Sequence, residues 1–155
     1  MWQAFDNLIE TAIERNVLFV VLAGDVYDNL DAQEGLQKKF RDGLQRLEKH
    51  DIHVYMIHGN HDPLRDKKIN RRPLPGNVHV FQTDKPHEFV AAESDEGKVF
   101  VSGISFASSV VKENLASQFN DLPSERARRR VGVLHTSMAG NNYHDPYAPC
   151  SVEDL

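Results

Sequence analysis

The stretch that decides the fold is Ile52-His53-Val54-Tyr55-Met56-Ile57, followed at once by His58-Gly59-Asn60-His61-Asp62. A short, mostly apolar run of this kind predicts a buried strand. It ends in a glycine, an amide, an imidazole and a carboxylate, and open α/β folds bind ligands at the carboxyl ends of their strands. Gly-Asn and Asp-Pro pairs are also common in turns, so the motif alone leaves a simple turn as an equal alternative.

Two further apolar runs end in the same way. Residues 17–22 lead into Gly24 and Asp25, and residues 131–134 lead into His135. Taken singly, Asp25 is typical of a turn or helix cap, and His135 of a histidine satisfied within a core. Together with Asn60 they place three side chains of metal-ligand type at three strand ends, which we expect to share one edge of the sheet.

The rest of the chain alternates helices and strands, which indicates an α/β fold with a largely parallel sheet. The expected helices have apolar faces at helical spacing, formed by Trp2, Phe5, Leu8, Ile9, Ala12 and Ile13 in the first and by Leu36, Phe40, Leu44 and Leu47 in the second. Asp31 and Glu34 are expected to cap the second helix. Residues 78–81 predict a short strand, 87–92 and 98–104 a hairpin, and 110–119 a third helix. From Thr136 to Leu155 we expect irregular chain.

Composition limits the classes of function. The 155 residues fit one domain, and the net charge of −5 argues against a grip on nucleic acid by the whole surface. The single cysteine, Cys150, excludes an internal disulfide and suits a reducing cytoplasm, where we expect the protein. The sequence shows no signal segment and no long apolar stretch, so we expect neither export nor a membrane span.

Three motifs carry a family resemblance: Gly24-Asp25-Val26-Tyr27-Asp28, Gly59-Asn60-His61-Asp62, and His135 after a strand. Together they resemble the calcineurin-like metallophosphoesterases, and within that superfamily the SbcD/Mre11-like DNA repair exonucleases. The resemblance implies a four-layer α-β-β-α sandwich of the metallo-dependent phosphatase type and a metal-dependent phosphodiester hydrolase that acts on DNA.

The chain also departs from the family pattern. It has no Asp-x-His motif ahead of its first helix and no Gly-His-x-His motif after His135. We therefore expect residues 1–155 to form a single incomplete metallophosphoesterase domain, a fragment that is inactive as it stands. The absent strand predicts exposed sheet edges and self-association through them.

The resemblance also implies roles for the site residues. Asp25 is the expected bridging ligand of two divalent cations, and Asn60 and His135 complete much of the shell of one of them. Mn²⁺ is the favoured metal, with Fe²⁺ and Zn²⁺ as alternatives. His61 is the expected acid beside the scissile phosphate, and Asp62 is expected to orient it through a hydrogen bond, or else to cap the turn.

A basic run follows the Gly-Asn-His-Asp motif directly. Such runs are more often solvated faces, but the position favours contact with a phosphate backbone by Arg65, Lys67, Lys68, Arg71 and Arg72. The resemblance further implies an SMC-like ATPase as partner. Two other functions stay open: a phosphoesterase of small nucleotides or phosphoproteins, and a catalytically inactive binding or assembly module. The exact substrate, the polarity of cleavage, the oligomeric state and the role of Asp28 do not follow from the sequence.

Overall fold

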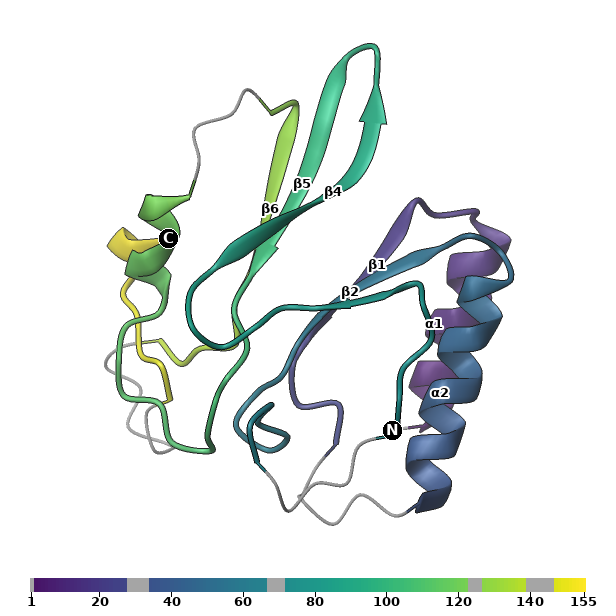
Figure 1. Ribbon diagram of the computed structural model, residues 1–155, viewed down its shortest axis with the longest axis horizontal. Helices are drawn as coiled ribbons and strands as arrows, with labels where there is room; N and C mark the ends of the chain where they lie inside the picture. The colour runs from purple at the N-terminus through teal and green to yellow at the C-terminus, as the bar shows by residue number, and fades with distance from the viewer. Residues whose placement is uncertain (1, 28–33, 67–71, 123–126, 139–146) are drawn as a thin grey trace.

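The computed structural model describes residues 2–27, 34–66, 72–122, 127–138 and 147–155. Within these ranges two helices and two three-stranded sheets form stacked layers (Figure 1). The elements are α1 (Trp2–Glu14), β1 (Phe19–Ala23), α2 (Glu34–Glu48), β2 (His53–Ile57), β3 (Val78–Val80), β4 (His87–Ser94), β5 (Gly97–Gly103), the 3₁₀ helix η1 (Ala116–Asp121), β6 (Arg129–Val133) and the 3₁₀ helix η2 (Val152–Asp154).

The first sheet, sheet A, has the strand order β1-β2-β3 and is parallel throughout. Phe19 pairs with His53, and Ala23 with Ile57, so β1 and β2 end at the same level. This sheet confirms the parallel arrangement expected from the alternation of helices and strands. Among the described residues β1 pairs with β2 alone, and Leu18 just before it is 69% exposed.

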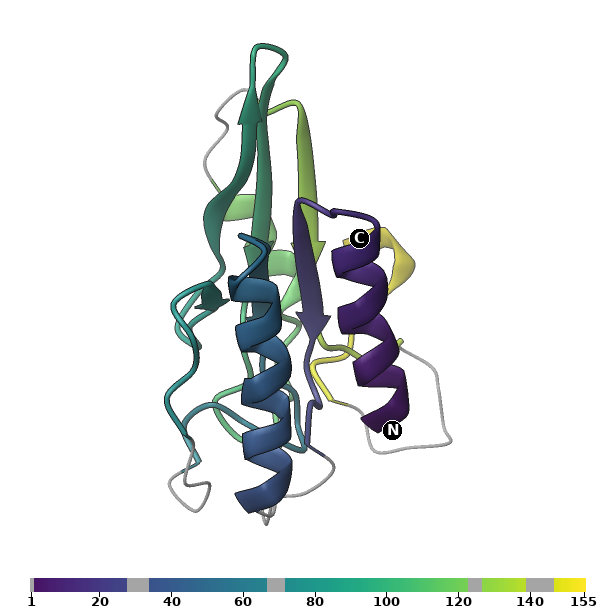
Figure 2. The ribbon, with the colours of Figure 1, turned by 90° about the vertical axis from the view of Figure 1, so that its right-hand side faces the viewer.

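Both helices cover one face of sheet A, as Figure 2 shows from the side. Their predicted apolar faces are confirmed, except that Leu8 is 37% exposed. The buried layer between helices and sheet consists of Ile9, Ala12, Phe40, Leu44, Leu47, Ile52, Val54 and Met56. The predicted cap residue Asp31 lies outside the described residues. No helix in the described part of the chain is long and apolar enough to cross a membrane.

The second sheet, sheet B, has the order β4-β5-β6. The predicted hairpin is confirmed as the antiparallel pair β4–β5, and β6 adds to β5 in parallel. Because side chains alternate along a strand, Tyr55 and Ile57 of β2 face sheet B while Val54 and Met56 face the helices. Tyr55 and Ile57 pack there with Phe81, Val101 and Val133.

Two sequence expectations are wrong. The strand that precedes His135 was expected in the same sheet as β1 and β2, but β6 belongs to sheet B. The third predicted helix, over residues 110–119, is also wrong: in this segment only the 3₁₀ helix η1 forms, from residue 116 onward, and residues 110–115 carry no helix. There the Asn114 side chain accepts a hydrogen bond from the amide of Ser117 (3.3 Å), a contact of the kind made at helix starts, so the helical turn begins after Asn114 and not at residue 110. The apolar spacing instead reflects burial of Val111 and Leu115 under the end of sheet B.

The stacking of the sheets sets the position of the functional residues. β1, β2 and β6 all run toward the lower end of the molecule in Figure 1. Their carboxyl ends therefore meet there, although they belong to two different sheets. Helices, sheet A and sheet B correspond to three layers of the mixed α/β sandwich implied by the resemblance.

Candidate metal centre

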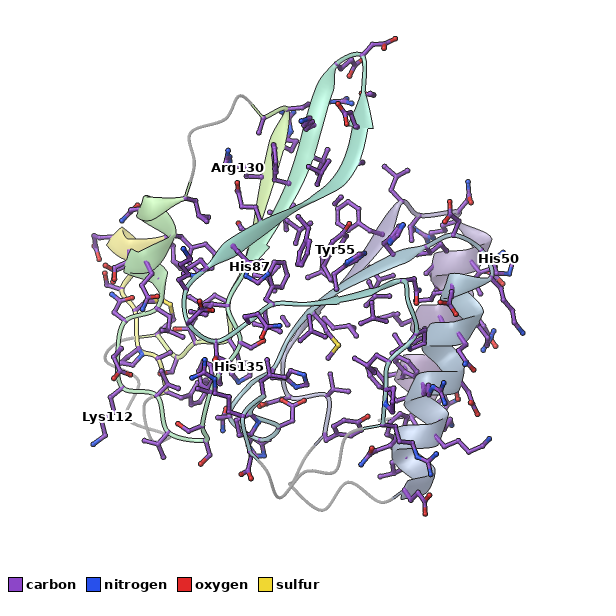
Figure 3. All side chains as sticks on the ribbon, viewed as in Figure 1. His50, Tyr55, His87, Lys112, Arg130 and His135 are labelled. Atoms are coloured by element: carbon purple, nitrogen blue, oxygen red, sulfur yellow. The ribbon has the colours of Figure 1, made fainter. Side chains whose placement is uncertain are left out.

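The three predicted metal ligands meet at this lower end. The imidazole Nε2 of His135 lies 2.9 Å from the side-chain oxygen of Asn60 and 3.2 Å from Oδ2 of Asp25. Asp25 and Asn60 follow the strands β1 and β2 of sheet A, whereas His135 follows β6 of sheet B. Figure 3 shows His135 below the ends of the strands, among the side chains of both layers.

The hydrogen bond of the other ring nitrogen of His135, Nδ1, determines whether Nε2 can act as a metal ligand. Nδ1 lies 3.0 Å from the carbonyl oxygen of Ala23, and because a carbonyl only accepts, Nδ1 donates. In the neutral ring Nε2 then carries a lone pair. Histidines that bind metals ordinarily hold their other N–H on a carbonyl or carboxylate in this way.

The donor set fits a divalent cation. Three electron-pair donors, Nε2 of His135, Oδ2 of Asp25 and the amide oxygen of Asn60, converge, and only a proton or a metal ion can relieve their mutual repulsion. Ligands ~2.1 Å from an octahedral cation are about 3 Å apart, which matches the two distances from Nε2 of His135 to Asn60 and Asp25. In the described part of the chain no three His, Cys, Asp or Glu side chains cluster as metal ligands, because the third ligand here is an amide.

Two glycines allow the turns to approach this closely. A Cβ on Gly59 would lie 2.2 Å from Oδ1 of Asp25, and a Cβ on Gly24 would lie 2.9 Å from both Gly59 N and His135 Nδ1. Gly24 has a φ of 91° and Asp25 a φ of 50°, so the chain turns sharply in the left-handed region after β1. A glycine before the aspartate is therefore needed for both space and backbone conformation.

The two residues predicted to act in catalysis lie in different surroundings. The amide of His61 donates to Oδ1 of Asp25 (3.0 Å), and the residue is exposed. Asp62 is buried, and its carboxylate accepts from the amides of Gly59 (2.8 Å) and Val26 (3.1 Å). These two bonds fit the turn-capping alternative for Asp62. Its expected role in orienting His61 stays a prediction.

The basic run is described only in part. Lys67, Lys68 and Arg71 lie outside the described residues, and Arg65 is exposed. Arg72 forms an ion pair with Glu34 at the start of α2, and its amide donates to the side chain of Gln37 (3.1 Å). Arg72 thus joins this segment to α2, and contact of the run with substrate stays a prediction.

Sequence reasoning missed the residues that hold the His135 ring. Tyr147 stacks on one face of it, with centroids 5.2 Å apart, and Phe106 meets it edge-on at 5.5 Å. Tyr147 is itself fixed by paired bonds with Ser137: the amide of Ser137 donates to its carbonyl (2.9 Å), and its amide donates to Oγ of Ser137 (3.1 Å). For Tyr147 the available signal was the run of aromatic and small polar residues after His135, which has no periodicity, and Phe106 lies just after β5 with no motif around it.

Known proteins give an independent comparison. A sequence profile of the calcineurin-like phosphoesterases matches residues 1–148. The chain is 34% identical to the uncharacterized metallophosphoesterase YhaO of Bacillus subtilis over 96% of its own length and 36% of that protein. It is 27% identical to the DNA double-strand break repair protein Mre11 of Thermoplasma acidophilum, over 88% of the chain and 37% of the relative.

A second archaeal relative agrees. The Mre11 protein of Methanococcus maripaludis is 24% identical over 99% of the chain and 40% of its own length. The chain thus spans well under half the length of these curated relatives. The profile match and the YhaO similarity agree with the geometry at Asp25, Asn60 and His135, and the chain belongs to the calcineurin-like phosphoesterase family.

Proposed function

We propose that this chain belongs to a divalent-metal-dependent phosphodiesterase that hydrolyses DNA, in the manner of the SbcD/Mre11-like nucleases. The observation that carries the proposal is the convergence of Asp25, Asn60 and His135 with Nδ1 of His135 bound to the Ala23 carbonyl. DNA is favoured over small nucleotides and phosphoproteins because two relatives are DNA double-strand break repair proteins.

The metal-binding roles follow from the donor set. Asp25, Asn60 and His135 would hold one cation, and Asp25 would share its carboxylate with a second. Oxygen and imidazole donors without a thiolate suit Mn²⁺ or Fe²⁺, with Zn²⁺ as a further alternative, and we favour Mn²⁺. Bound cations would supply positive charge to the phosphate and an activated nucleophile.

His61 is the proposed proton donor. Its amide is fixed to Asp25, so its backbone is held beside the metal ligands while the residue remains exposed to an incoming substrate. A ring there can give a proton to the departing oxygen, a contribution of typically ~10²–10⁴-fold in rate. Arg65 and its basic neighbours are the proposed contacts to the phosphate backbone.

The proposed partner and location follow the family resemblance and the composition. We propose an SMC-like ATPase as partner and a cytoplasmic location, in line with the single buried cysteine, Cys150. The edge of β1 that pairs with no strand of the described residues is the proposed place for self-association.

The test compares substrates and variants. We expect Mn²⁺-dependent cleavage of linear DNA by the full-length enzyme to which this chain belongs, lost in Asp25→Ala together with metal binding. Loss of turnover with retained metal is expected in His61→Ala. Asn7→Ala, an exposed asparagine on α1, is the matched control for Asn60→Ala.

Other results would select another function. Release of p-nitrophenol from bis(p-nitrophenyl) phosphate without DNA cleavage would favour the small-substrate phosphoesterase. DNA binding without hydrolysis of either substrate would favour the binding module.

A further inference from the structure

The turn that carries Asn60 and the turn that carries Asp25 are tied together by two carboxylates. Asp62, in the second turn, accepts the amide of Val26 in the first turn at 3.1 Å. Asp25, in the first turn, accepts the amide of His61 in the second turn at 3.0 Å. Each turn therefore donates one amide to a carboxylate of the other, and we call this pair of bonds the cross-brace.

The two halves of the cross-brace differ in their surroundings. Asp25 uses Oδ1 for the brace, while its Oδ2 faces Nε2 of His135 and the candidate metal position. Asp62 is 0% exposed, and its other oxygen accepts the amide of Gly59 at 2.8 Å. Both oxygens of Asp62 are thus committed to main-chain amides that flank the metal ligands, one before Asn60 and one after Asp25.

His58 packs against the buried half of the brace. Its Nδ1 lies 3.4 Å from Oδ2 of Asp62, beyond the range of a well-formed hydrogen bond but close enough for electrostatic contact. His58 is 3% exposed and is itself held on sheet B, because its amide donates to Oγ of Ser105 (3.0 Å) and its carbonyl accepts from Phe106 (2.9 Å). The position of Asp62 therefore depends on the turn after β2 of sheet A and, through His58, on the chain that follows β5 of sheet B.

We propose that Asp62, packed on His58, is a positioning residue that sets the separation of Asp25 and Asn60 by tying their two turns together. This inference rests on the proposed function only in taking those side chains for cation ligands. It gives Asp62 a role that needs no contact with the His61 ring. Groups that orient metal ligands typically change metal affinity by ~10–100-fold when they are replaced.

The test replaces one acceptor by a donor. In Asp62→Asn the amide oxygen can accept from Gly59 or from Val26 but not from both, because the NH₂ group faces the second N–H. We expect the dissociation constant for Mn²⁺, measured by calorimetry on this chain, to rise by ~10–100-fold. We also expect amide hydrogen exchange to quicken at Val26, Gly59 and His61.

His61 is the discriminating probe, because Asp62 does not accept its amide in the contacts described above. If Asp62 only caps its own turn, amide exchange in Asp62→Asn quickens at Gly59 and Val26 alone. The exchange rate of the His61 amide and the Mn²⁺ affinity then stay as in the wild type, and this result overturns the inference. Wild-type chain that binds no Mn²⁺ would refute the proposed function, and the exchange of His61 would still decide the cross-brace.

Three further variants keep the result interpretable. Glu48→Gln removes a carboxylate that accepts the amide of Gly76 (2.8 Å) far from the site, and should leave Mn²⁺ affinity unchanged. Leu44→Ala destabilises the helical layer without touching either turn, and should lower the melting temperature alone. Should Asp62→Asn fail to fold, His58→Leu loosens the same carboxylate from its far side. An unchanged His61 exchange rate in that variant overturns the proposal.

Discussion

The ring of His135 is held on every side by the contacts described. Nδ1 donates to Ala23, Nε2 faces Asp25 and Asn60, and Tyr147 and Phe106 contact the ring itself. A ligand with this little freedom loses little conformational entropy when it binds a cation. Metal affinity should therefore respond to residues that never touch the metal.

Tyr147 provides a test of this expectation. A stacked aromatic pair contributes about 0.5–1.5 kcal/mol beyond buried area, so in Tyr147→Leu the dissociation constant for Mn²⁺ should rise by about 2- to 10-fold. Tyr147→Phe preserves the stacked ring and is the matched control, expected to bind like the wild type. Equal affinities in the leucine and phenylalanine variants would show that the ring does not steady His135.

Gly59 provides a second test at the scale of one residue. In Gly59→Ala the new methyl would stand 2.2 Å from Oδ1 of Asp25, so the two turns must separate. Overpacking of this kind costs typically about 1–3 kcal/mol, and we expect that loss in urea unfolding together with loss of Mn²⁺ binding.

The control for Gly59 lies on α2. A Cβ on Gly35 would meet nothing within 4 Å, so Gly35→Ala should be neutral or stabilise the fold by up to about 1 kcal/mol. Mn²⁺ binding by Gly59→Ala that matches Gly35→Ala would contradict the close approach of the two turns.

The three candidate ligands could be named from the sequence, but the contacts that support them could not. Asp25, Asn60 and His135 each follow a strand, and a strand end is a local signal that a single sequence carries. The contacts of His135 with Tyr147 and of Gly24 with Gly59 join segments far apart in the chain, and no local pattern encodes them. For the same reason the cross-brace could not be read from the order of residues.

At the scale of elements, α1, α2 and β2 were predictable because their apolar faces have the period of their secondary structure. The predictions of elements were wrong where apolar residues are buried without following the period of a helix or strand. Residues 110–119 have apolar residues that are buried under sheet B without forming an α-helix. The placement of β6 in the second sheet was missed because it pairs with β5 of a hairpin, and a sequence does not show which strands a hairpin joins.

The strands β2, β3 and β4 share a cluster of rings that includes the two histidines His53 and His79. The His79 ring stacks on Tyr55 (4.9 Å between centroids), and its centroid lies 5.1 Å from that of Phe89 on β4. Nε2 of His79 and Nδ1 of His53 form a hydrogen bond of 2.9 Å. Burial, and then the neighbouring His53, lower the pKa of His79 below its usual value of 6.5. The folded protein therefore favours the neutral ring.

The sign of the pH effect follows. Below about pH 6.5 the unfolded chain binds more protons at this residue than the folded chain, so stability falls as the pH falls. We expect the melting temperature of His79→Phe, which preserves the stacking, to fall less than that of the wild type between pH 8 and pH 5.5. His50→Phe, at an exposed position after α2, should behave like the wild type. A steeper fall of the melting temperature in His79→Phe than in the wild type would refute the lowered pKa of His79 as the cause of the pH effect.

At the scale of the whole molecule, the described residues bring three donors to one candidate metal position, and of these only Asp25 would also bind the proposed second cation. We therefore expect the 155-residue chain to bind one Mn²⁺ per molecule and to lack nuclease activity, because one cation cannot hold both the attacking and the leaving oxygen. Calorimetry gives the stoichiometry, with Asn60→Ala as the non-binding reference. Two Mn²⁺ per chain, or DNA cleavage that is lost in Asn60→Ala, would contradict this expectation.

His135 stands on sheet B while Asp25 and Asn60 stand on sheet A, and this division makes a bound cation a removable cross-link between the layers. Such a link closes the chain between residues 25 and 135, which restricts the unfolded state, and its binding energy becomes folding energy. At a free Mn²⁺ concentration 100 times the dissociation constant, the gain is about 2.7 kcal/mol, or a rise of about 5–10 °C in melting temperature for a chain of this size. Scanning calorimetry with and without Mn²⁺ should show this rise in the wild type and its absence in Asn60→Ala, so that the amount of metal in the cell would set how firmly the two sheets stay together.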